Sequence, residues 1–324
     1  MRERCTLENI SIIVLIISLA LLLAGLGSAA AASGAQSTIT ECQIIDDPGE
    51  YTLDENLTTD EETCLEITAS DVKLEGNEHT IERTDTGSDD GNVVGVYVDR
   101  EVDDPTNITV QNLTTTGWEY GIRFDGVADS QIRNVTAENN IQHGIDVRSF
   151  SENVTVADSV AIDNGDRGIY FLSFTDESSV VDSVAKGNGV EHPDGAGIGV
   201  ATSSDENVLE NNTLVDNRNG VFVGFFSSAN VVKNSTLSGN EVGVFLDDSD
   251  NEVTKNDIAG NDKGLVNDGT ATATATENWW GHASGPGGED GRTNPAGNVV
   301  GQGDEIEGDT EFDPWLRQPV HRAS

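Results

Sequence analysis

Basic residues are scarce in this chain. Lys and Arg together number 17 of 324 residues, against 58 Asp and Glu, and the formal net charge is −41. A protein that binds nucleic acid by neutralising phosphates needs a basic face, so this class is excluded, and an anionic membrane surface is disfavoured as a partner for the same reason. Such an acidic surface repels itself in dilute salt and is tolerated where salt screens it. The composition therefore indicates adaptation to high salt.

Aromatic residues (5%), Pro (7) and Met (1) are also few, whereas Gly reaches 35. A helical domain would carry more Leu and Ala and much less Gly. High net charge can accompany disorder, but the apolar residues of this chain recur too regularly for a disordered protein. The chain is therefore expected to fold, and to fold without extensive helix.

A long apolar run occurs near the N-terminus. It covers residues 10–27, follows Arg2 and Arg4, and leads into small residues that end at Ala32. This layout predicts a secretory signal over residues 1–32 and an extracellular or cell-surface location for the remainder. An uncleaved anchor is the alternative, because about 18 apolar residues nearly span a bilayer. No membrane insertion is expected beyond this segment.

Cysteine is limited to three residues. Cys5 precedes the apolar run and would leave with the signal, which leaves Cys42 and Cys64 in the exported chain. An even number of cysteines in an oxidising compartment predicts a disulfide between them.

A repeated motif of Gly, apolar, any residue, apolar determines the predicted fold. Its spacings are 26, 23, 24, 29, 23, 23 and 21 residues, and two further short strand-like stretches lie between successive copies. The copies begin at Gly95, Gly121, Gly144, Gly168, Gly197, Gly220 and Gly243, with a decayed copy at Gly264. One such unit cannot bury its own apolar face, so the units must stack. The sequence predicts an all-β parallel β-helix with three strands per coil and about ten coils.

The repeat also predicts which side chains point inward. Strand side chains alternate, so the first and third residues after each Gly should face the core and the second should face out. The 22-residue spacing of Cys42 and Cys64 places them on successive coils, where a disulfide would link the N-terminal coils. Trp residues near the C-terminus are expected to cap the open end of the core. The predicted division is a signal over 1–32, an N-terminal cap and first coils over 33–92, repeats over 93–270, and a C-terminal strand and cap over 271–324.

Asn or Asp recurs at one bend of the repeat. Asn tolerates the left-handed backbone that sharp bends need, and stacked amides can hydrogen-bond from coil to coil. The expected bend residues are Asn112, Asn134, Asp158, Asp182, Asn211, Asn234 and Asn256. Four of them lie in glycosylation sequons but are expected to be buried, which leaves Asn56, Asn107 and Asn153 as the candidates for a glycan.

Particular segments resemble a known family. The sequences CLEITASDV at residues 64–72 and GNEHTI at 76–81 resemble the start of the β-helix domain of NosD-like proteins. The repeats resemble those shared by NosD-like proteins and pectate-lyase-fold enzymes, and the endings NWWGHASGP (278–286) and DPWL (313–316) are similar to secreted haloarchaeal members. The resemblance covers about residues 38–317. It implies a right-handed β-helix with carbohydrate binding or sugar hydrolysis, and the name NosD also implies copper delivery.

The outward positions offer a candidate binding face. A polysaccharide site needs aromatic planes for sugar faces and charged groups for hydroxyls and uronates. The ligand-binding candidates are Tyr97, Arg123, His143, Asp146, Arg148, Arg167, Tyr170, Phe222 and Phe245. Salt bridges between coils of a purely structural face are the competing interpretation. Phe222 and Phe245, beside Phe225 and Phe226, are expected to form an exposed apolar strip unless a loop covers them.

Catalysis is a second interpretation of the same face. The candidates are Arg123, Asp125, Asp146 and Arg148, which could serve a Ca²⁺-dependent uronate lyase or a glycoside hydrolase. Carboxylate pairs such as Asp99 with Asp125 are expected by chance in so acidic a chain. Ca²⁺ could bind the acidic stretches at 103–104 and 247–248, although no EF-hand spacing is present; no other cofactor and no metal ligand is assigned. Copper has little support, because the five His are scattered and the exported chain lacks Met.

Together these observations predict a secreted, monomeric β-helix that binds a polysaccharide or surface glycan without catalysis. A polysaccharide lyase or glycoside hydrolase on the same face is the first alternative. A structural or adhesive rod that recognises no ligand is the second.

Overall fold

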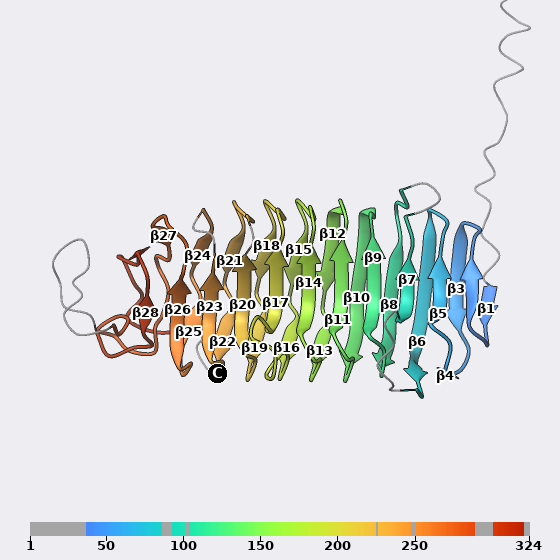
Figure 1. Ribbon diagram of the computed structural model, residues 1–324, viewed down its shortest axis with the longest axis horizontal. Coiled ribbons are helices and arrows are strands. Elements are labelled where there is room, and N and C mark those ends of the chain that lie inside the picture. Colours follow the sequence, from blue (N-terminus) through green and yellow to red (C-terminus); the bar gives the residue numbers. More distant parts are fainter. Residues whose placement is uncertain are drawn as a thin grey trace, which may run out of the picture. The chain divides into compact units, whose positions relative to one another are not determined.

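The computed structural model describes residues 37–85, 93–100, 104–224, 226–247, 250–288 and 301–320. The chain divides into two units, Met1–Ala35 and Gln36–Ser324. The first unit contains the predicted signal and lies outside the described ranges. Within the described ranges every regular element is a β-strand (Figure 1). None of these residues forms a helix long and apolar enough to span a membrane.

The unit is a parallel β-solenoid built from two sheets. One sheet has eleven strands, one from each successive coil: β2 (Gln43–Ile45), β5 (Thr63–Ile67), β7 (Val94–Val98), β9 (Tyr120–Asp125), β11 (His143–Arg148), β14 (Arg167–Leu172), β17 (Ala196–Ala201), β20 (Asn219–Gly224), β23 (Val242–Leu246), β26 (Lys263–Asn267) and β28 (Ile306–Glu307). Each is parallel to its neighbour, and the strands lie side by side along the long axis of the unit (Figure 1).

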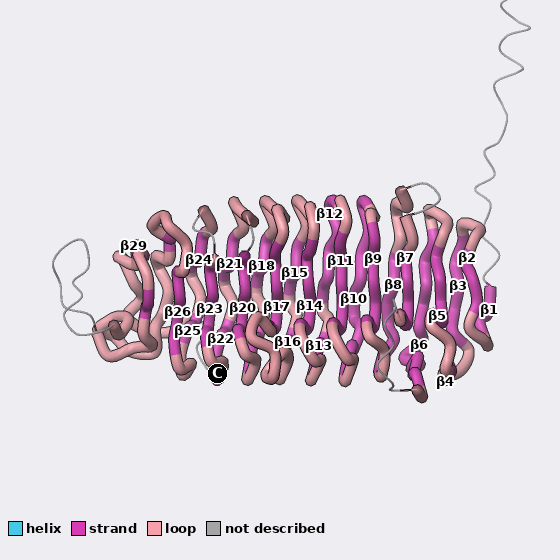
Figure 2. The backbone as a smooth tube through the Cα atoms, viewed as in Figure 1, coloured by secondary structure: helices cyan, strands magenta, loops and turns pink. Residues whose placement is uncertain are grey.

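The other sheet has eighteen strands, since most coils contribute two. They are β1 (Ser37–Ile39), β3 (Gly49–Leu53), β4 (Leu57–Thr59), β6 (Val72–Arg83), β8 (Thr109–Thr116), β10 (Ala128–Glu138), β12 (Glu152–Ala157), β13 (Val160–Ile162), β15 (Ser179–Val181), β16 (Val184–Lys186), β18 (Val208–Glu210), β19 (Thr213–Val215), β21 (Val231–Lys233), β22 (Thr236–Ser238), β24 (Glu252–Thr254), β25 (Asp257–Ile258), β27 (Ala273–Thr274) and β29 (Thr310–Glu311). Short turns join the strands of each coil (Figure 2).

The coil that contains β11 shows how the sequence makes the repeat. Ile145 and Val147 are fully buried in the main core, whereas Asp146 between them lies on the opposite side of the strand. Ile145 then pairs in register with Ile169 of the next coil. The same alternation recurs in the other coils, so one apolar core runs through the solenoid. The predicted assignment of inward positions is confirmed.

The bend residues have the predicted backbone but not the predicted burial. Six of the seven adopt left-handed φ values near 50°, but Asn134 and Asn211 are exposed and Asn112 and Asn234 are only partly buried. The reason is geometric: the left-handed residue points outward and the residue after it points in. Asn256 is buried because it occupies that following position, and Lys255 is the left-handed residue of its coil (φ 58°). The predicted glycan positions Asn56, Asn107 and Asn153 are exposed.

Amides stack at the predicted bend, where Asn134 Nδ2 donates to Asn112 Oδ1 at 2.6 Å, and a longer series lies at another turn. Its members are Asn140, Asn164, Asn188, Asn217, Asn240 and Asn261, here termed the Asn ladder, and each is buried. Asn188 Nδ2 donates to Asn217 Oδ1 at 3.0 Å and to the Ala161 carbonyl at 2.9 Å, while its own Oδ1 accepts from Asn164 Nδ2 at 2.9 Å. The ladder therefore satisfies buried backbone groups and fixes the stacking of successive coils.

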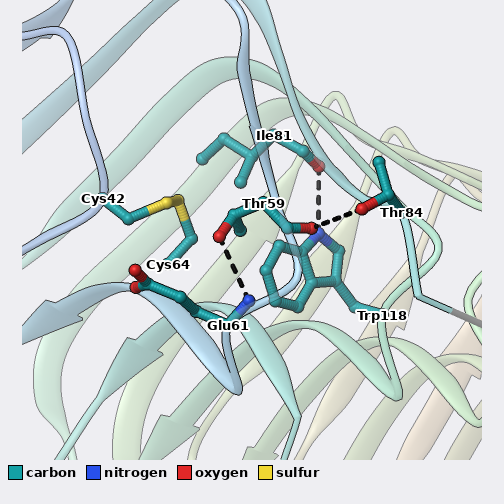
Figure 3. Close-up of a disulfide and its surroundings, with 7 residues drawn as sticks. All are labelled: Cys42, Thr59, Glu61, Cys64, Ile81, Thr84 and Trp118. Carbon is teal, nitrogen blue, oxygen red and sulfur yellow. Dashed lines mark hydrogen bonds between the residues drawn. A yellow bond between two sulfur atoms is a disulfide. The ribbon is translucent and has the colours of Figure 1, made fainter.

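The two ends of the core are closed as the sequence predicts. Cys42 and Cys64 form a disulfide with a Cα–Cα distance of 4.5 Å (Figure 3), which links successive coils at the N-terminal end. Trp118 is buried nearby and donates from Nε1 to the Ile81 carbonyl at 3.0 Å (Figure 3). At the other end Trp280 is fully buried and Trp315 packs against the same core.

Candidate functional site on the outer face of the eleven-stranded sheet

The register of the eleven-stranded sheet brings the predicted outward residues into one row. Each member of the row pairs in register with the next, on successive strands from β7 to β23: Tyr97, Arg123, Asp146, Tyr170, Gly199, Phe222 and Phe245. The predicted ligand-binding residues are thus neighbours, as the repeat requires.

These side chains are outward-facing but not solvent-exposed. Arg123 is 2% exposed and Asp146 is 0% exposed, and Tyr170 and Phe222 are also buried. Large side chains on adjacent strands cover one another across the face. The expected exposed apolar strip is therefore wrong for Phe222 and only partly right for Phe245, which is half-buried; Phe226 is exposed, and Phe225 lies outside the described residues.

The buried and partly buried residues at the centre of the face are here termed the polar cluster. It consists of Tyr120, Arg123, His143, Asp146, Arg148, Asp166, Arg167 and Tyr170. Asp146 lies at its centre. One of its oxygens is 3.0 Å from Arg123 Nε and 3.5 Å from Arg148 Nη1, and the other is 3.7 Å from His143 Nδ1. Burial alone would raise the pKa of Asp146, but His143, Arg148 and Arg123 outweigh it and hold the pKa at about 2.

His143 bridges two carboxylates and two phenol rings. Its Nδ1 faces Asp146, and its Nε2 lies 3.2 Å from Asp166 Oδ2. The rings of Tyr120 and Tyr170 meet the imidazole edge-to-face, with centroid distances of 5.3 and 4.9 Å. These contacts fix the imidazole in place from four sides.

The sequence did not indicate Asp166 and His192 as site residues. Asp166 pairs with Arg167 and His143, and its second oxygen lies 3.2 Å from His192 Nδ1. Burial raises the pKa of Asp166, but hydrogen bonding to His143 and the nearby cations lower it overall. His192 belongs to the turn that lengthens the Gly-motif spacing to 29 residues. That insertion was the available signal.

Two Arg side chains lie over aromatic rings. The Arg123 guanidinium is 3.4 Å from the Tyr120 ring centroid, and that of Arg167 is 4.2 Å from Tyr170 and 5.5 Å from Phe222. Gly199 makes room for this arrangement, because a Cβ at that position would lie 2.7 Å from Arg167 Cδ and 2.9 Å from the Tyr170 ring. The outward glycine of the repeat thus has a packing role.

The phenols of the polar cluster are weak acids that stay protonated. Burial raises the pKa of Tyr170 to about 12 and also raises the pKa of Tyr120, whose hydroxyl donates to Gln142 Oε1 at 2.8 Å. Both are therefore neutral near pH 7. With its charges paired and its surface covered, the polar cluster is suited to hold the face rigid.

An open groove lies beside the polar cluster on the same face. It has a volume of about 330 Å³ and is here termed the Phe groove, lined by Pro193, Asp194, Arg218, Asn219, Phe222, Glu241, Val242, Phe245, Lys263, Val266, Asp268 and Glu307. Phe222 and Phe245 stack in parallel with centroids 5.5 Å apart. The next residue in the row is Val266, which pairs with Phe245. Because the row of large side chains ends at Val266, space opens in front of Phe245.

The Phe groove carries charges of both signs. Arg218 forms an ion pair with Glu241, and Lys263 forms one with Glu307. Asp194 and Asp268 add two further carboxylates to the lining. The balance is negative, which favours an uncharged ligand over a polyanion.

Two predicted residues lie at the margin of this face. Tyr97 donates from its hydroxyl to Asp99 Oδ1 at 3.3 Å, and burial together with Asp99 and Asp125 raises its pKa. Asp125 pairs in register with Arg148 on the next strand, but Arg148 turns toward Asp146. The structure therefore brings Arg123, Asp146 and Arg148 together and leaves Asp125 at the edge. The acidic stretches at 103–104 and 247–248 fall partly outside the described residues.

Comparison with known families gives two matches. The model described as "Right handed beta helix region" matches residues 4–224, more than half of the chain. The model described as "Periplasmic copper-binding protein (NosD)" matches residues 176–282. The expected resemblance to NosD-like right-handed β-helix proteins is therefore confirmed. No curated protein sequence matches the chain.

Solved structures with the same fold are known. The Azotobacter vinelandii mannuronan C-5 epimerase AlgE4 A-module has a TM-score of 0.54 and 21% identity, with 92% of this chain and 95% of that chain covered. The periplasmic alginate epimerase AlgG has a TM-score of 0.55 and 13% identity, with 87% and 76% covered. The Dettilon tailspike protein has a TM-score of 0.54 and 13% identity, with 84% and 61% covered. At these identities the likeness concerns the fold alone.

Proposed function

The chain belongs to the right-handed β-helix family, and from this premise we propose that it binds a polysaccharide in the Phe groove without catalysis. The observation that carries the proposal is the groove itself, an open space beside a stacked Phe pair on the outer face of the eleven-stranded sheet. Aromatic rings beside polar side chains suit sugars, which present apolar C–H faces and hydroxyl groups. The relatives that share the fold include enzymes named for alginate and mannuronan, both polysaccharides.

The charge of the groove favours a neutral polysaccharide. Arg218 and Lys263 can each donate to hydroxyls while remaining paired with Glu241 and Glu307. A uronate chain would also meet the carboxylates of Asp194 and Asp268 and the generally acidic surface. Arg123 and Arg148 are both directed at Asp146, so these two side chains give no further support for an acidic sugar.

We also propose that this binding takes place outside the cytoplasm. The Cys42–Cys64 disulfide suits an oxidising compartment. The predicted signal over residues 1–32 would export the chain, and the matching NosD model and the AlgG structure are both described as periplasmic. The acidic composition supports a saline environment of the haloarchaeal type. We propose that the protein acts there as a monomer.

Copper does not fit the residues of this chain. The segment that matches NosD contains two His, His192 and His282, and neither Cys nor Met. His192 contacts Asp166, and His282 Nδ1 lies 2.7 Å from Ser284 Oγ. Among the described residues no group of three His, Cys, Asp or Glu side chains is arranged to hold a metal ion. Soft copper ligands are therefore missing, and no step through copper is proposed.

The direct test is a polysaccharide-binding screen in molar salt with wild type, Phe245→Ala and Val184→Ala. Val184 is an exposed apolar residue on β16 of the other sheet and serves as the matched control. We expect wild type to bind a neutral polysaccharide, Phe245→Ala to bind it about tenfold more weakly, equivalent to about 1.4 kcal/mol, and Val184→Ala to bind normally. Folding of each variant is checked by its thermal transition.

Two results would replace this proposal. If wild type binds no glycan in the screen, the structural-rod alternative takes its place. If incubation with an acidic polysaccharide yields unsaturated products that absorb in the ultraviolet, or new reducing ends, the lyase or hydrolase alternative takes its place, with Arg123, Asp125, Asp146 and Arg148 as the first residues to replace.

A further inference from the structure

A second group of aromatic residues lies at the corner that follows the strands of the eleven-stranded sheet. After β11, β14, β17 and β20 the chain makes equivalent turns, and their outermost positions hold Phe150, Phe174, Ser203 and Phe226. The hydrogen bonds from Phe150 N to Ser173 O (3.0 Å) and from Phe174 N to Thr202 O (3.1 Å) fix this register. The three Phe residues are here termed the Phe corner.

The Phe corner is exposed to solvent. Phe150, Phe174 and Phe226 are 66%, 43% and 81% exposed. Phe150 and Phe174 stack in parallel, with centroids 4.8 Å apart and an interplanar angle of 4°, and the Arg100 guanidinium lies 5.6 Å from the Phe150 ring. Arg100 thus covers one end of the stack. The other end, the free face of Phe174, looks toward the coil of Ser203, which carries no ring.

Folding does not require Phe at these positions. The three residues have left-handed φ values of 69°, 63° and 68°, a conformation that bulky side chains adopt with strain. Ser203 makes the same turn with φ 56°, so a small residue is sufficient. Exposed aromatic rings held in an unfavourable backbone conformation indicate a contact surface.

The spacing suits a ring inserted between two of these side chains. Phe174 and Phe226 are two coils apart, about 9.6 Å at the usual strand spacing. A ring that touches both neighbours needs about 7–8 Å between their planes, and a puckered sugar ring is thicker than an aromatic one. The space between Phe174 and Phe226 above Ser203, here termed the corner slot, therefore has room for one saccharide ring.

The surroundings of the corner slot favour an uncharged sugar. The residue before three of the outermost positions carries a partly exposed hydroxyl that can exchange hydrogen bonds with a ligand: Ser149, Ser173 and Thr202. The turns at residues 149–151, 173–175 and 202–204 contain no Asp or Glu, in a chain with 58 of them. These turns thus lack the acidic side chains of the surrounding surface, and the cation Arg100 lies at the Phe150 end of the stack.

We propose that the Phe corner is a second glycan-binding site, in which the corner slot takes one ring of a neutral saccharide. The proposal rests on the proposed function for the class of ligand, but it does not depend on the Phe groove. Wild type would then bind two neutral oligosaccharides per chain.

The test is isothermal titration calorimetry in molar NaCl with glucose-, mannose- and galactose-based tetrasaccharides. We expect Phe174→Ala and Ser203→Phe each to lose one site, the first by removing the stacking face and the second by filling the corner slot. Phe174→Trp should keep that site, and so should the control Val190→Ala, which shortens an exposed apolar residue in another turn. Any fall in the melting temperature of Ser203→Phe should be small, because stacking of the new ring on Phe174 offsets the strain of a bulky side chain in the left-handed conformation.

The outcomes separate this proposal from its alternatives. Phe174→Leu keeps an apolar surface without a flat ring, so it should lose the sugar site; unchanged sugar binding in Phe174→Leu or in Ser203→Phe would overturn the proposal. Concentration-dependent self-association that Phe174→Ala abolishes would assign the Phe corner to a second copy instead. If Phe245→Ala leaves binding unchanged while Ser203→Phe abolishes it, the Phe groove fails and the Phe corner stands.

Discussion

At the scale of single residues, Asp146 shows how the outer face differs from an ordinary strand surface. Its place in the repeat predicts a solvent-facing carboxylate whose replacement would be tolerated. In the structure it is fully buried and contacts Arg123, Arg148 and His143. Tolerance of replacement is therefore wrong for this position, and Asp146→Ala is expected to destabilise the fold.

We predict that Asp146→Asn lowers the free energy of unfolding by about 3 kcal/mol, because removing one member of a buried ion pair typically costs ~3–5 kcal/mol. Asp125→Asn, one coil away at the margin of the face, is the control and should change it by less than about 0.5 kcal/mol. Urea denaturation of the two variants makes the comparison. Equal effects would mean that the polar cluster contributes nothing to stability.

The same residue predicts a dependence on pH. The pKa of Asp146 is lowered on folding from 3.8 to about 2, so its contribution is fully present above about pH 4 and is lost as the pH falls toward 2. The difference corresponds to about 2–3 kcal/mol. Between pH 5 and 2 wild type should lose that much more stability than Asp146→Asn, and parallel acid titrations would contradict the assignment.

At the scale of elements, the sequence predicts the strands but not how the side chains pack on their outer face. The spacing of the Gly motif, the apolar residues on either side of Asp146 and the left-handed Asn or Asp residues predict each coil, because inward packing and backbone conformation repeat with the chain. Outward packing does not repeat. Arg167 can lie across Tyr170 only because Gly199 follows it one coil later. The 29-residue spacing marks an insertion, but it does not predict that His192 within it contacts Asp166.

The Asn ladder gives a prediction for one element. Asn188→Ala removes four hydrogen bonds between its side chain and Asn164, Asn217 and Ala161. Each buried group left without a partner costs about 1–3 kcal/mol. We therefore expect the free energy of unfolding, measured by denaturant titration, to fall by about 3 kcal/mol. Lys186→Ala, on an exposed side chain in the same coil, should be nearly neutral, and a loss as large as that of Asn188→Ala would count against the ladder.

The inward row gives a second element-scale prediction. Ile145 and Ile169 are fully buried and stacked on adjacent coils. Ile145→Asp or Ile169→Asp should prevent folding, since each places a carboxylate in a continuous apolar core. The measurement is the circular dichroism spectrum of purified protein; a β-rich spectrum with a cooperative melt in either variant would show that the inward assignment is wrong.

At the scale of the whole molecule, stability depends on closing both ends of an open-ended core. The Cys42–Cys64 disulfide spans 22 residues at the N-terminal end. Replacing both cysteines with Ser should cost about 3 kcal/mol, as expected for a loop of this length, and should loosen the first coils before the rest. Hydrogen exchange of the segment 37–67 measures this, and unchanged protection there would contradict the role assigned to the link.

The central claim is that the Phe groove on the outer face of the eleven-stranded sheet holds a polysaccharide. The most direct measurement is a crystal structure of the protein with the best-binding neutral tetrasaccharide. The account predicts a sugar ring in contact with Phe245, at carbon–carbon distances of about 4 Å, with hydroxyls near Arg218 or Lys263. A groove that stays free of sugar at saturating concentration, while the tetrasaccharide binds away from this face, would contradict it.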